Sequence, residues 1–121
     1  MELTAVNPAD RQIIERYAAS GFRVSGVAYS GPVLVFPDRT MPWAEAALTA
    51  ESLAPVVAHG GIELLLLGLG RRIVPVAASL RAWLKAGGTA LELMDTGAAC
   101  RTYNVLLAEN RRVAAALLPP V

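Results

Sequence analysis

The sequence predicts an α/β fold: a three-layer single domain with a mixed central sheet flanked by helices and an N-terminal β-hairpin layer. Three observations carry this prediction. The apolar run 62–67, broken only by Glu63, is typical of a strand buried on both faces of a parallel sheet. Strand and helix patterns alternate from there on, whereas β-branched runs separated by glycine turns precede it. At 121 residues the chain has room for one core, so residues 1–121 are expected to form one domain.

Two interpretations stay open for the first segment, residues 8–21. Asn7 could cap a short helix that has Pro8 in its first turn and ends at Gly21. The alternative is an extended segment that leads directly into the following strand. In the first case the side chains of this segment would lie on a helix face, and in the second on a sheet.

The next segment is expected to form a β-hairpin. Two runs rich in β-branched and aromatic residues, 22–29 and 32–36, flank the dipeptide Ser30-Gly31, which suits a tight turn. Pro32 fits the first residue of a strand, where it removes no interior ladder bond. Residues 40–43 are expected to form another short strand.

Helices and strands alternate in the remaining chain. We expect three helices: one opened by Thr49 or Ser52 and ended by Gly60-Gly61, one from about Pro75 to Gly87, and one capped by Thr96 and running to about Asn110. A strand is expected after each helix, at 62–67, 90–94 and 113–118. Pro55 is compatible with the first helix only if that helix starts late. The strands 62–67 and 90–94 should be parallel neighbours, because a right-handed crossover helix connects them.

Composition excludes several classes of protein. With 55% hydrophobic and 17% charged residues the chain is not disordered, and no stretch approaches the roughly 18 apolar residues of a membrane helix. A net charge of +1 gives no electrostatic argument for nucleic acid or for an anionic membrane. One cysteine and one histidine cannot form a disulfide or a usual zinc site. The N-terminus lacks the pattern of a signal peptide. We therefore expect a cytoplasmic protein without cofactor or metal.

The carboxyl ends of the two predicted parallel strands are the most informative place for a site. They would bring Gly68, Gly70, Arg71 and Arg72 next to Asp95 and Thr96 and to the amides that open the following helix. Amides and arginines together suit an anion, although arginines also commonly lie on solvated loops. Ile73 stands where the third glycine of a dinucleotide fingerprint would be, so this loop does not match that motif.

The helix after Thr96 contains three further candidates. Cys100 lies early in the helix beside Arg101, two features that can lower a thiol pKa, but its position borders the apolar face and no histidine is assignable as its base. Packing is therefore the preferred interpretation for Cys100. Arg101 and Asn104 share the opposite face, where they could contact a partner or tie loops down. Without a catalytic motif, a non-enzymatic role is favoured.

The segment 94–111, Met-Asp-Thr-Gly-Ala-Ala-Cys-Arg-Thr-Tyr-Asn-Val-Leu-Leu-Ala-Glu-Asn-Arg, carries a specific resemblance. It resembles the small bacterial and archaeal family whose mitochondrial member is NADH dehydrogenase (complex I) assembly factor 3. The resemblance covers nearly the whole chain, with matching segments at 21–31, Trp43, 64–70 and 113–117. The family's glycine loop usually reads Gly-Thr-Gly, whereas Leu69 stands at its centre here.

The resemblance implies a three-layer α/β fold with an added small β layer and an extended N-terminal segment. It brings no established reaction or cofactor. It implies an accessory or assembly protein that binds a protein partner, such as a subunit or assembly intermediate of a membrane-bound respiratory complex; a homodimer is also an allowed state. Nucleic acid and direct membrane insertion are not expected, and any membrane location would be peripheral, through the partner. The competing hypothesis is a small-ligand, anion-binding or enzymatic module at Gly68–Gly70 and Asp95–Arg101.

Overall fold

The computed structural model describes residue 3 and residues 11–120. Its elements in chain order are β1 (Ile14–Ala18), β2 (Gly21–Val24), β3 (Val27–Ser30), β4 (Val33–Val35), β5 (Thr40–Pro42), α1 (Ala50–His59), β6 (Leu64–Leu69), α2 (Ala78–Ala86), β7 (Ala90–Met94), α3 (Thr96–Ala108) and β8 (Val113–Leu118). They form a three-stranded sheet in the order β1-β2-β3 and a five-stranded sheet in the order β5-β4-β8-β6-β7.

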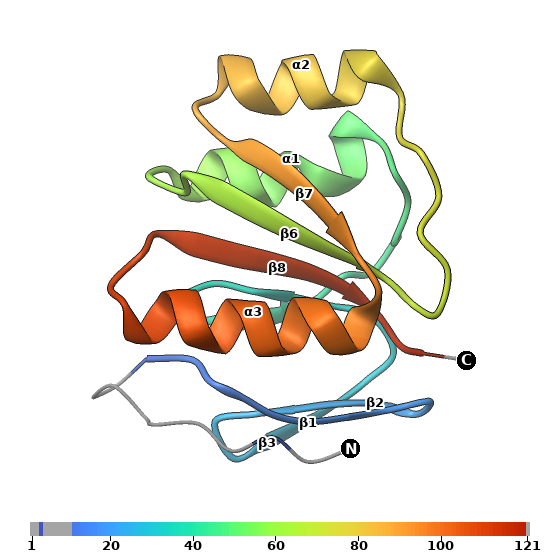
Figure 1. Ribbon diagram of the computed structural model, residues 1–121, viewed down its shortest axis with the longest axis vertical. Helices are drawn as coiled ribbons and strands as arrows, with labels where there is room; N and C mark the ends of the chain where they lie inside the picture. The colour runs from blue at the N-terminus through green and yellow to red at the C-terminus, as the bar shows by residue number, and fades with distance from the viewer. Residues whose placement is uncertain (1–2, 4–10, 121) are drawn as a thin grey trace.

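The elements are arranged in layers (Figure 1). Helices α1 and α2 cover one face of the five-stranded sheet and α3 covers the other, while the three-stranded sheet lies beyond α3. The large sheet is mixed, because β6 pairs in parallel with β7 and β8 whereas β4 pairs antiparallel with β8 and β5. The predicted mixed α/β fold with a small additional β layer is therefore confirmed.

The predicted parallel pairing of the strands β6 and β7 is also confirmed. Leu65 pairs with Leu91 on one side and with Ala114 on the other, so β6 is enclosed by two parallel strands. The strands 90–94 and 113–118 have the predicted bounds, while the strand expected at 62–67 runs from Leu64 to Leu69. β6 is buried from its second residue onward, as its apolar composition requires.

The predicted β-hairpin is wrong in its partners. β2 pairs antiparallel with β3 through the turn at Ser25-Gly26, and both residues of this turn have positive φ. The run 32–36 instead provides β4, which pairs with β8 through Val33 and Leu117 in the other sheet. Gly31, at φ +77°, lies where the chain passes from one sheet to the other. The strand expected at 40–43 is confirmed as β5.

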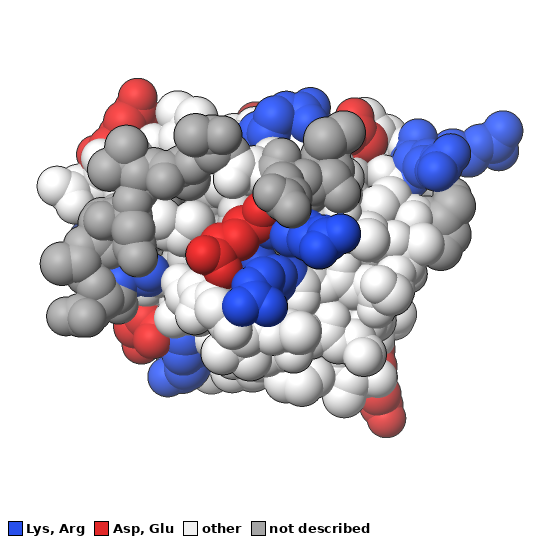
Figure 2. All heavy atoms as spheres, turned by 90° about the horizontal axis from the view of Figure 1, so that it is seen from below, with Lys and Arg blue, Asp and Glu red and all other residues white. Residues whose placement is uncertain are grey.

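The extended interpretation of the first segment is confirmed where the structure describes it. Residues 14–18 form β1, which pairs with β2, so the alternative helix is wrong there; Asn7 and Pro8 lie outside the described residues. On the outer face of this small sheet acidic and basic side chains lie next to one another (Figure 2), and Arg23 Nε is 3.7 Å from Glu15 Oε1. The inner face packs against α3.

Helix α1 begins earlier than Pro55 suggested. Thr49 is its N-cap, and the Thr49 hydroxyl accepts a hydrogen bond from Ser52 N at 3.1 Å, so the helix contains Pro55. The proline removes only the bond to the carbonyl of Glu51, an exposed residue that water can reach. At the other end His59 stacks on Phe36 with 4.5 Å between ring centroids.

Helix α2 begins at Ala78, three residues after the predicted start at Pro75. The residue before a proline favours extended backbone, and the segment 71–75 is exposed. Helix therefore starts where apolar residues spaced by four, Leu80 and Leu84, become buried against the sheet. Arg81 and Lys85 of this helix are exposed.

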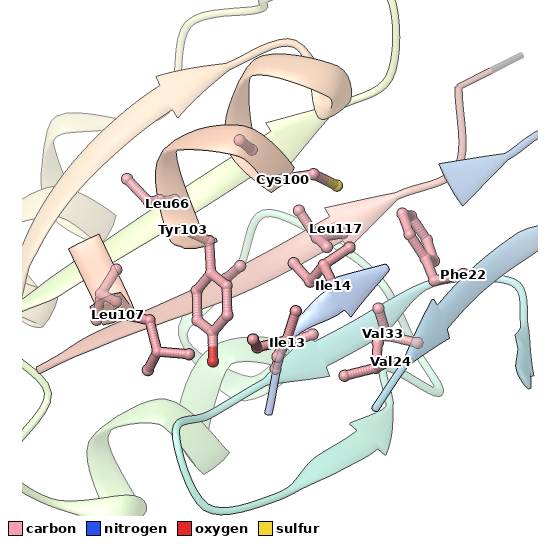
Figure 3. Close-up of a cluster of buried hydrophobic side chains, with 14 residues drawn as sticks. Ile13, Ile14, Phe22, Val24, Val33, Leu66, Cys100, Tyr103, Leu107 and Leu117 are labelled. Atoms are coloured by element: carbon pink, nitrogen blue, oxygen red, sulfur yellow. The ribbon is translucent and has the colours of Figure 1, made fainter. Parts of the chain in front are cut away.

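Two hydrophobic cores lie on the two faces of the large sheet. One lies under α1 and α2 and contains Trp43, and Trp83 packs against it partly buried. The other lies between the large sheet, α3 and the small sheet. Figure 3 shows this second core, with Tyr103 projecting from α3 and Leu66 and Leu117 from the large sheet. The candidate site described below lies at the N-terminal end of α3, at the border of this second core.

Candidate functional site

The start of α3 joins three elements at the carboxyl ends of the parallel strands. Asp95, not Thr96, is the N-cap: its Oδ1 accepts from Ala98 N at 2.9 Å. The Thr96 hydroxyl accepts from Gly70 N at 2.8 Å and donates to the carbonyl of Leu118. The predicted cap role of Thr96 is therefore wrong, because its completely buried side chain points to the ends of β6 and β8 instead.

An open hollow lies beside this junction. It has a volume of about 600 Å³ and is lined by polar and small residues from the end of β1, the loop after β6, the start of α3 and the C-terminal segment: Tyr17, Ala18, Ala19, Gly70, Arg71, Asp95, Gly97, Arg101 and Pro120. The expected meeting of residues 70, 71, 95 and 101 at one edge of the sheet is thus observed. A volume in this range suits a small ligand or a side chain of a partner.

Tyr17 and Arg101 approach each other over Gly97. A Cβ at Gly97 would lie 2.7 Å from the hydroxyl oxygen of Tyr17 and 3.3 Å from Nη1 of Arg101. Only glycine leaves these two polar groups where they are. At this point the wall of the hollow is therefore formed by the hydroxyl of Tyr17, the guanidinium of Arg101 and the backbone of Gly97, which both groups approach closely.

The charges of the hollow favour an anion. Within the described part of the chain, neither Arg71 nor Arg101 has a carboxylate oxygen within 4.0 Å. Asp95 is the acidic residue of the lining, and one of its oxygens is engaged by the amide of Ala98. The expected anion-binding amides are partly engaged, since Ala98 N and Ala99 N both donate to Asp95. The guanidinium groups of Arg71 and Arg101 add donors that carry positive charge.

Five of the predicted candidates do not line this hollow: Gly68, Arg72, Thr96, Cys100 and Asn104. Gly68 is buried beneath α3, and a Cβ there would lie 2.8 Å from Leu117 Cδ2 and 3.2 Å from Ala99 Cβ. Its role is therefore the close packing of α3 on β6. Arg72 borders a second hollow of about 230 Å³, on the side of Trp43 and Leu118.

Asn104 ties α3 to the small sheet. Its side chain accepts from Ile14 N at 3.0 Å and donates to Ile14 O at 2.8 Å. This pair of bonds matches the alternative in which the polar face of the helix holds other segments down. Arg101, three residues earlier on the helix, remains exposed and is the member of this face that is available to a partner.

Cys100 is completely buried, which confirms the predicted packing position. Burial raises the pKa of the thiol from 9.0 to about 12, and the opposing effect of the neighbouring Arg101 charge is smaller. Because the thiolate is the nucleophile, this environment argues against nucleophilic chemistry at Cys100. Tyr103 is also buried; burial raises the pKa of its hydroxyl, which donates to Gln12 O at 3.0 Å.

Sequence reasoning missed four residues of the hollow: Tyr17, Ala18, Ala19 and Pro120. No local pattern places these segments at the start of α3, about 80 residues from β1 in the chain. Among the described residues, no group of three or more His, Cys, Asp or Glu side chains is placed to hold a metal ion. None of the helices found there has the length and apolarity needed to cross a bilayer.

Solved structures with the same architecture come from several bacteria. A crystal structure described as an outer membrane protein from Bartonella henselae superposes with a TM-score of 0.84 and is 33% identical; the similarity covers 92% of this chain and 97% of that one. The solution structure of a Bordetella pertussis protein described as a Mth938-like domain has a TM-score of 0.80 and 29% identity, covering 98% and 92%. The fold is therefore an established one.

Relatives of similar sequence are found in bacteria and in animals. An uncharacterised protein of Rhodobacter capsulatus is 40% identical over 107 residues, which cover 88% of this chain and 83% of that protein. NADH dehydrogenase [ubiquinone] 1 alpha subcomplex assembly factor 3 of Xenopus tropicalis is 34% identical over 116 residues, and that of Danio rerio 37% over 112 residues. These cover 93% and 89% of this chain but only 63% and 64% of the assembly factors, less than two thirds of their length.

The family model agrees with both comparisons and confirms the resemblance noted in the sequence. It matches residues 14–118, from the first residue of β1 to the last residue of β8, and so includes every helix and strand described above. The chain belongs to the family described as "Protein of unknown function (DUF498/DUF598)".

Proposed function

We propose that this protein is a non-enzymatic accessory or assembly protein, and that its client is a subunit or assembly intermediate of a membrane-bound respiratory complex. The observation that carries the proposal is the similarity to animal proteins named as assembly factors, which runs through about nine tenths of this chain. The remaining third of those proteins lies outside the similarity, so the client is inferred across branches of the family.

The docking residues of this proposal are Arg101 and Arg71 at the open hollow. The other polar residues of the α3 segment have intramolecular roles: Asp95 caps the helix, Thr96 joins two strand ends and Asn104 holds the small sheet. Among the described residues the two arginines have no such role, and both are exposed. Arginine at the rim of a hollow suits a partner's carboxylate, because its planar guanidinium can donate two parallel hydrogen bonds.

The experiment is a crosslinked pull-down from solubilised native membranes, comparing wild type with Arg101→Ala and Arg71→Ala. We expect each variant to keep its melting temperature and to lose the crosslinked partner. Arg112→Ala is the matched control: it removes an exposed arginine at the opposite end of β8, where its guanidinium is 3.7 Å from Glu63. Recovery of the same partner by Arg101→Ala, corrected for folded protein, would show that this hollow is not the docking site.

A second candidate function is the binding of a small anion in the same hollow. It is favoured by one specific observation, the two arginines without carboxylate partners around a space of about 600 Å³. A thermal-shift screen of anions, nucleotides and metabolites tests it. A compound present at a hundred times its dissociation constant adds about 2.7 kcal/mol to stability, so a true ligand gives a clear shift. If no compound raises the melting temperature, the protein-partner function stands alone.

A further inference from the structure

The segment between β6 and α2 places apolar side chains in water. Ile73 is 59% exposed and Val74 44% exposed, and in the described part of the chain only Val27 and Val105 are comparable large hydrophobic residues. The two are consecutive and follow directly on Arg71 and Arg72, which are also exposed. In Figure 1 this segment runs along the margin of the molecule, away from both sheets.

The charges of this part of the chain are strongly unbalanced. Residues 64–91 contain four of the eleven Lys and Arg residues and none of the ten Asp and Glu residues. The rest of the chain therefore has seven basic against ten acidic residues. This stretch lies between Glu63 and Glu92, and Asp95 lines the same hollow as Arg71, so the local excess of basic charge consists of Arg71 and Arg72 themselves. These two arginines have no carboxylate within 4.0 Å among the described residues.

We infer that residues 71–74 form a peripheral contact with an anionic lipid surface. Arg71 and Arg72 bind the lipid phosphates, and Ile73 and Val74 enter the boundary between headgroups and acyl chains. A bilayer offers negative charge and apolar depth side by side, which is the pairing that this segment presents. No element crosses the bilayer in this arrangement. Arg71 also lines the hollow proposed for the protein client, whereas Arg72, Ile73 and Val74 do not, so these three residues distinguish the lipid contact from the client site.

The extent of the apolar surface favours lipid as the occupant. Ile73 and Val74 are exposed aliphatic side chains. The neighbouring hollow is also apolar: Val74 and Arg72 border it together with Trp43, Leu48 and Leu69. Apolar surface therefore continues from the exposed pair into the body of the protein, with an arginine at its edge.

Co-sedimentation with protein-free vesicles tests the inference. The full chain is mixed with vesicles of phosphatidylcholine alone or with one third phosphatidylglycerol, at low and physiological salt. We expect binding to the anionic vesicles only, weaker at higher salt. Arg71→Gln/Arg72→Gln should lower the partition coefficient roughly 30-fold, which corresponds to about 1 kcal/mol per arginine. Ile73→Ser/Val74→Ser should lower it by roughly tenfold, with the salt dependence retained.

Matched controls come from the same molecule. Arg111→Gln/Arg112→Gln changes the net charge by the same amount, and Val105→Ser removes another exposed valine; both should bind as wild type does. Equal binding to neutral vesicles, no binding to anionic vesicles, or equal loss in the control variants would overturn the inference. So would a protein partner that requires Ile73 and Val74 while the vesicles remain unbound. The pull-down with Arg101→Ala is independent of each of these results.

Discussion

Two arginine pairs lie at opposite ends of the same two parallel strands. Arg111 and Arg112 precede β8, and both approach Glu63 just before β6, with Nε of Arg111 3.0 Å from the Glu63 carboxylate and Nη2 of Arg112 3.7 Å from it. Arg71 follows β6 after one residue, Gly70, and it and Arg72 lie beside exposed apolar residues; among the described residues neither has a carboxylate oxygen within 4.0 Å. The same Arg-Arg dipeptide thus forms intramolecular ion pairs at one end of the strands and, among the described residues, an unpaired basic surface at the other.

The difference shows that an arginine's effect depends on what surrounds its charge. At Glu63 the hydrogen bonds from Arg111 and from the Arg112 backbone hold the carboxyl pKa below its usual value. At Cys100 burial outweighs the neighbouring Arg101 charge. The predictions below test this difference, beginning with the largest expected effect.

The thiol of Cys100 should be almost inert in the folded protein. A pKa raised from 9.0 to about 12 lowers the thiolate fraction about a thousand-fold at neutral pH, and burial also blocks the reagent. Titration with a thiol reagent should give slow labelling of native protein and one rapid equivalent after denaturation. Fast, stoichiometric labelling without denaturant would show that the charge of Arg101 controls this site.

Thr96→Val should destabilise the domain by about 2–4 kcal/mol, more than the loss of a helix cap would. The change leaves the amide of Gly70 and the carbonyl of Leu118 without the hydroxyl as hydrogen-bond partner, and each unsatisfied buried group costs about 1–3 kcal/mol. Chemical denaturation measures the loss. Thr96→Ser keeps the hydroxyl and should keep most of the stability. Unchanged stability in Thr96→Val, or a larger loss in Thr96→Ser than in Thr96→Val, would mean that packing of the methyl group matters more than the two hydrogen bonds of the hydroxyl.

The ion pairs at Glu63 should give its carboxyl a pKa below 4.5, measurable by NMR titration. The ionised form is favoured in the folded state, so the contribution of Glu63 to stability is present above the unfolded pKa and is lost as pH falls through the lower folded pKa. Arg111→Gln/Arg112→Gln should return the pKa towards 4.5. Arg71→Gln/Arg72→Gln should leave it unchanged, and any other result would remove the contrast between the two pairs.

The smallest effect is expected in thermal stability. Arg111→Gln/Arg112→Gln should lower the melting temperature slightly at low salt and less at high salt, since exposed ion pairs contribute little and are screened. Arg71→Gln/Arg72→Gln should not lower it under either condition. A clear decrease in the second variant would indicate an intramolecular partner for Arg71 or Arg72.

The sequence predicted the parallel part of the fold well and the N-terminal third poorly. The strands at 90–94 and 113–118 have the predicted bounds because buried apolar runs between glycine stops leave few other solutions. The hairpin was assigned to the wrong partners because β4 pairs with β8, more than 75 residues away in the chain. A β-branched run is compatible with either sheet, so local pattern does not select its neighbour.

The candidate site, like the fold, could be predicted from the sequence only in part. Residues 70, 71, 95 and 101 could be placed together from the sequence, because carboxyl ends of parallel strands meet at one edge. Tyr17 and Pro120 could not, because their approach depends on how the small sheet packs on α3. The role of Thr96 was misread for a related reason: its position before a helix suggests a cap, but its hydroxyl is directed to strand ends that only the folded sheet brings near.

The sequence by itself determined the fold class, the parallel pairing of β6 and β7, the buried position of Cys100 and the family. These depend on apolar periodicity and on contiguous motifs, which are properties of short segments. Only the tertiary structure decided which arginines are paired, which glycine supports a hollow and which apolar residues remain in water. Those outcomes depend on contacts between distant segments, where one neighbouring carboxylate such as Glu63 changes the behaviour of an otherwise identical arginine pair.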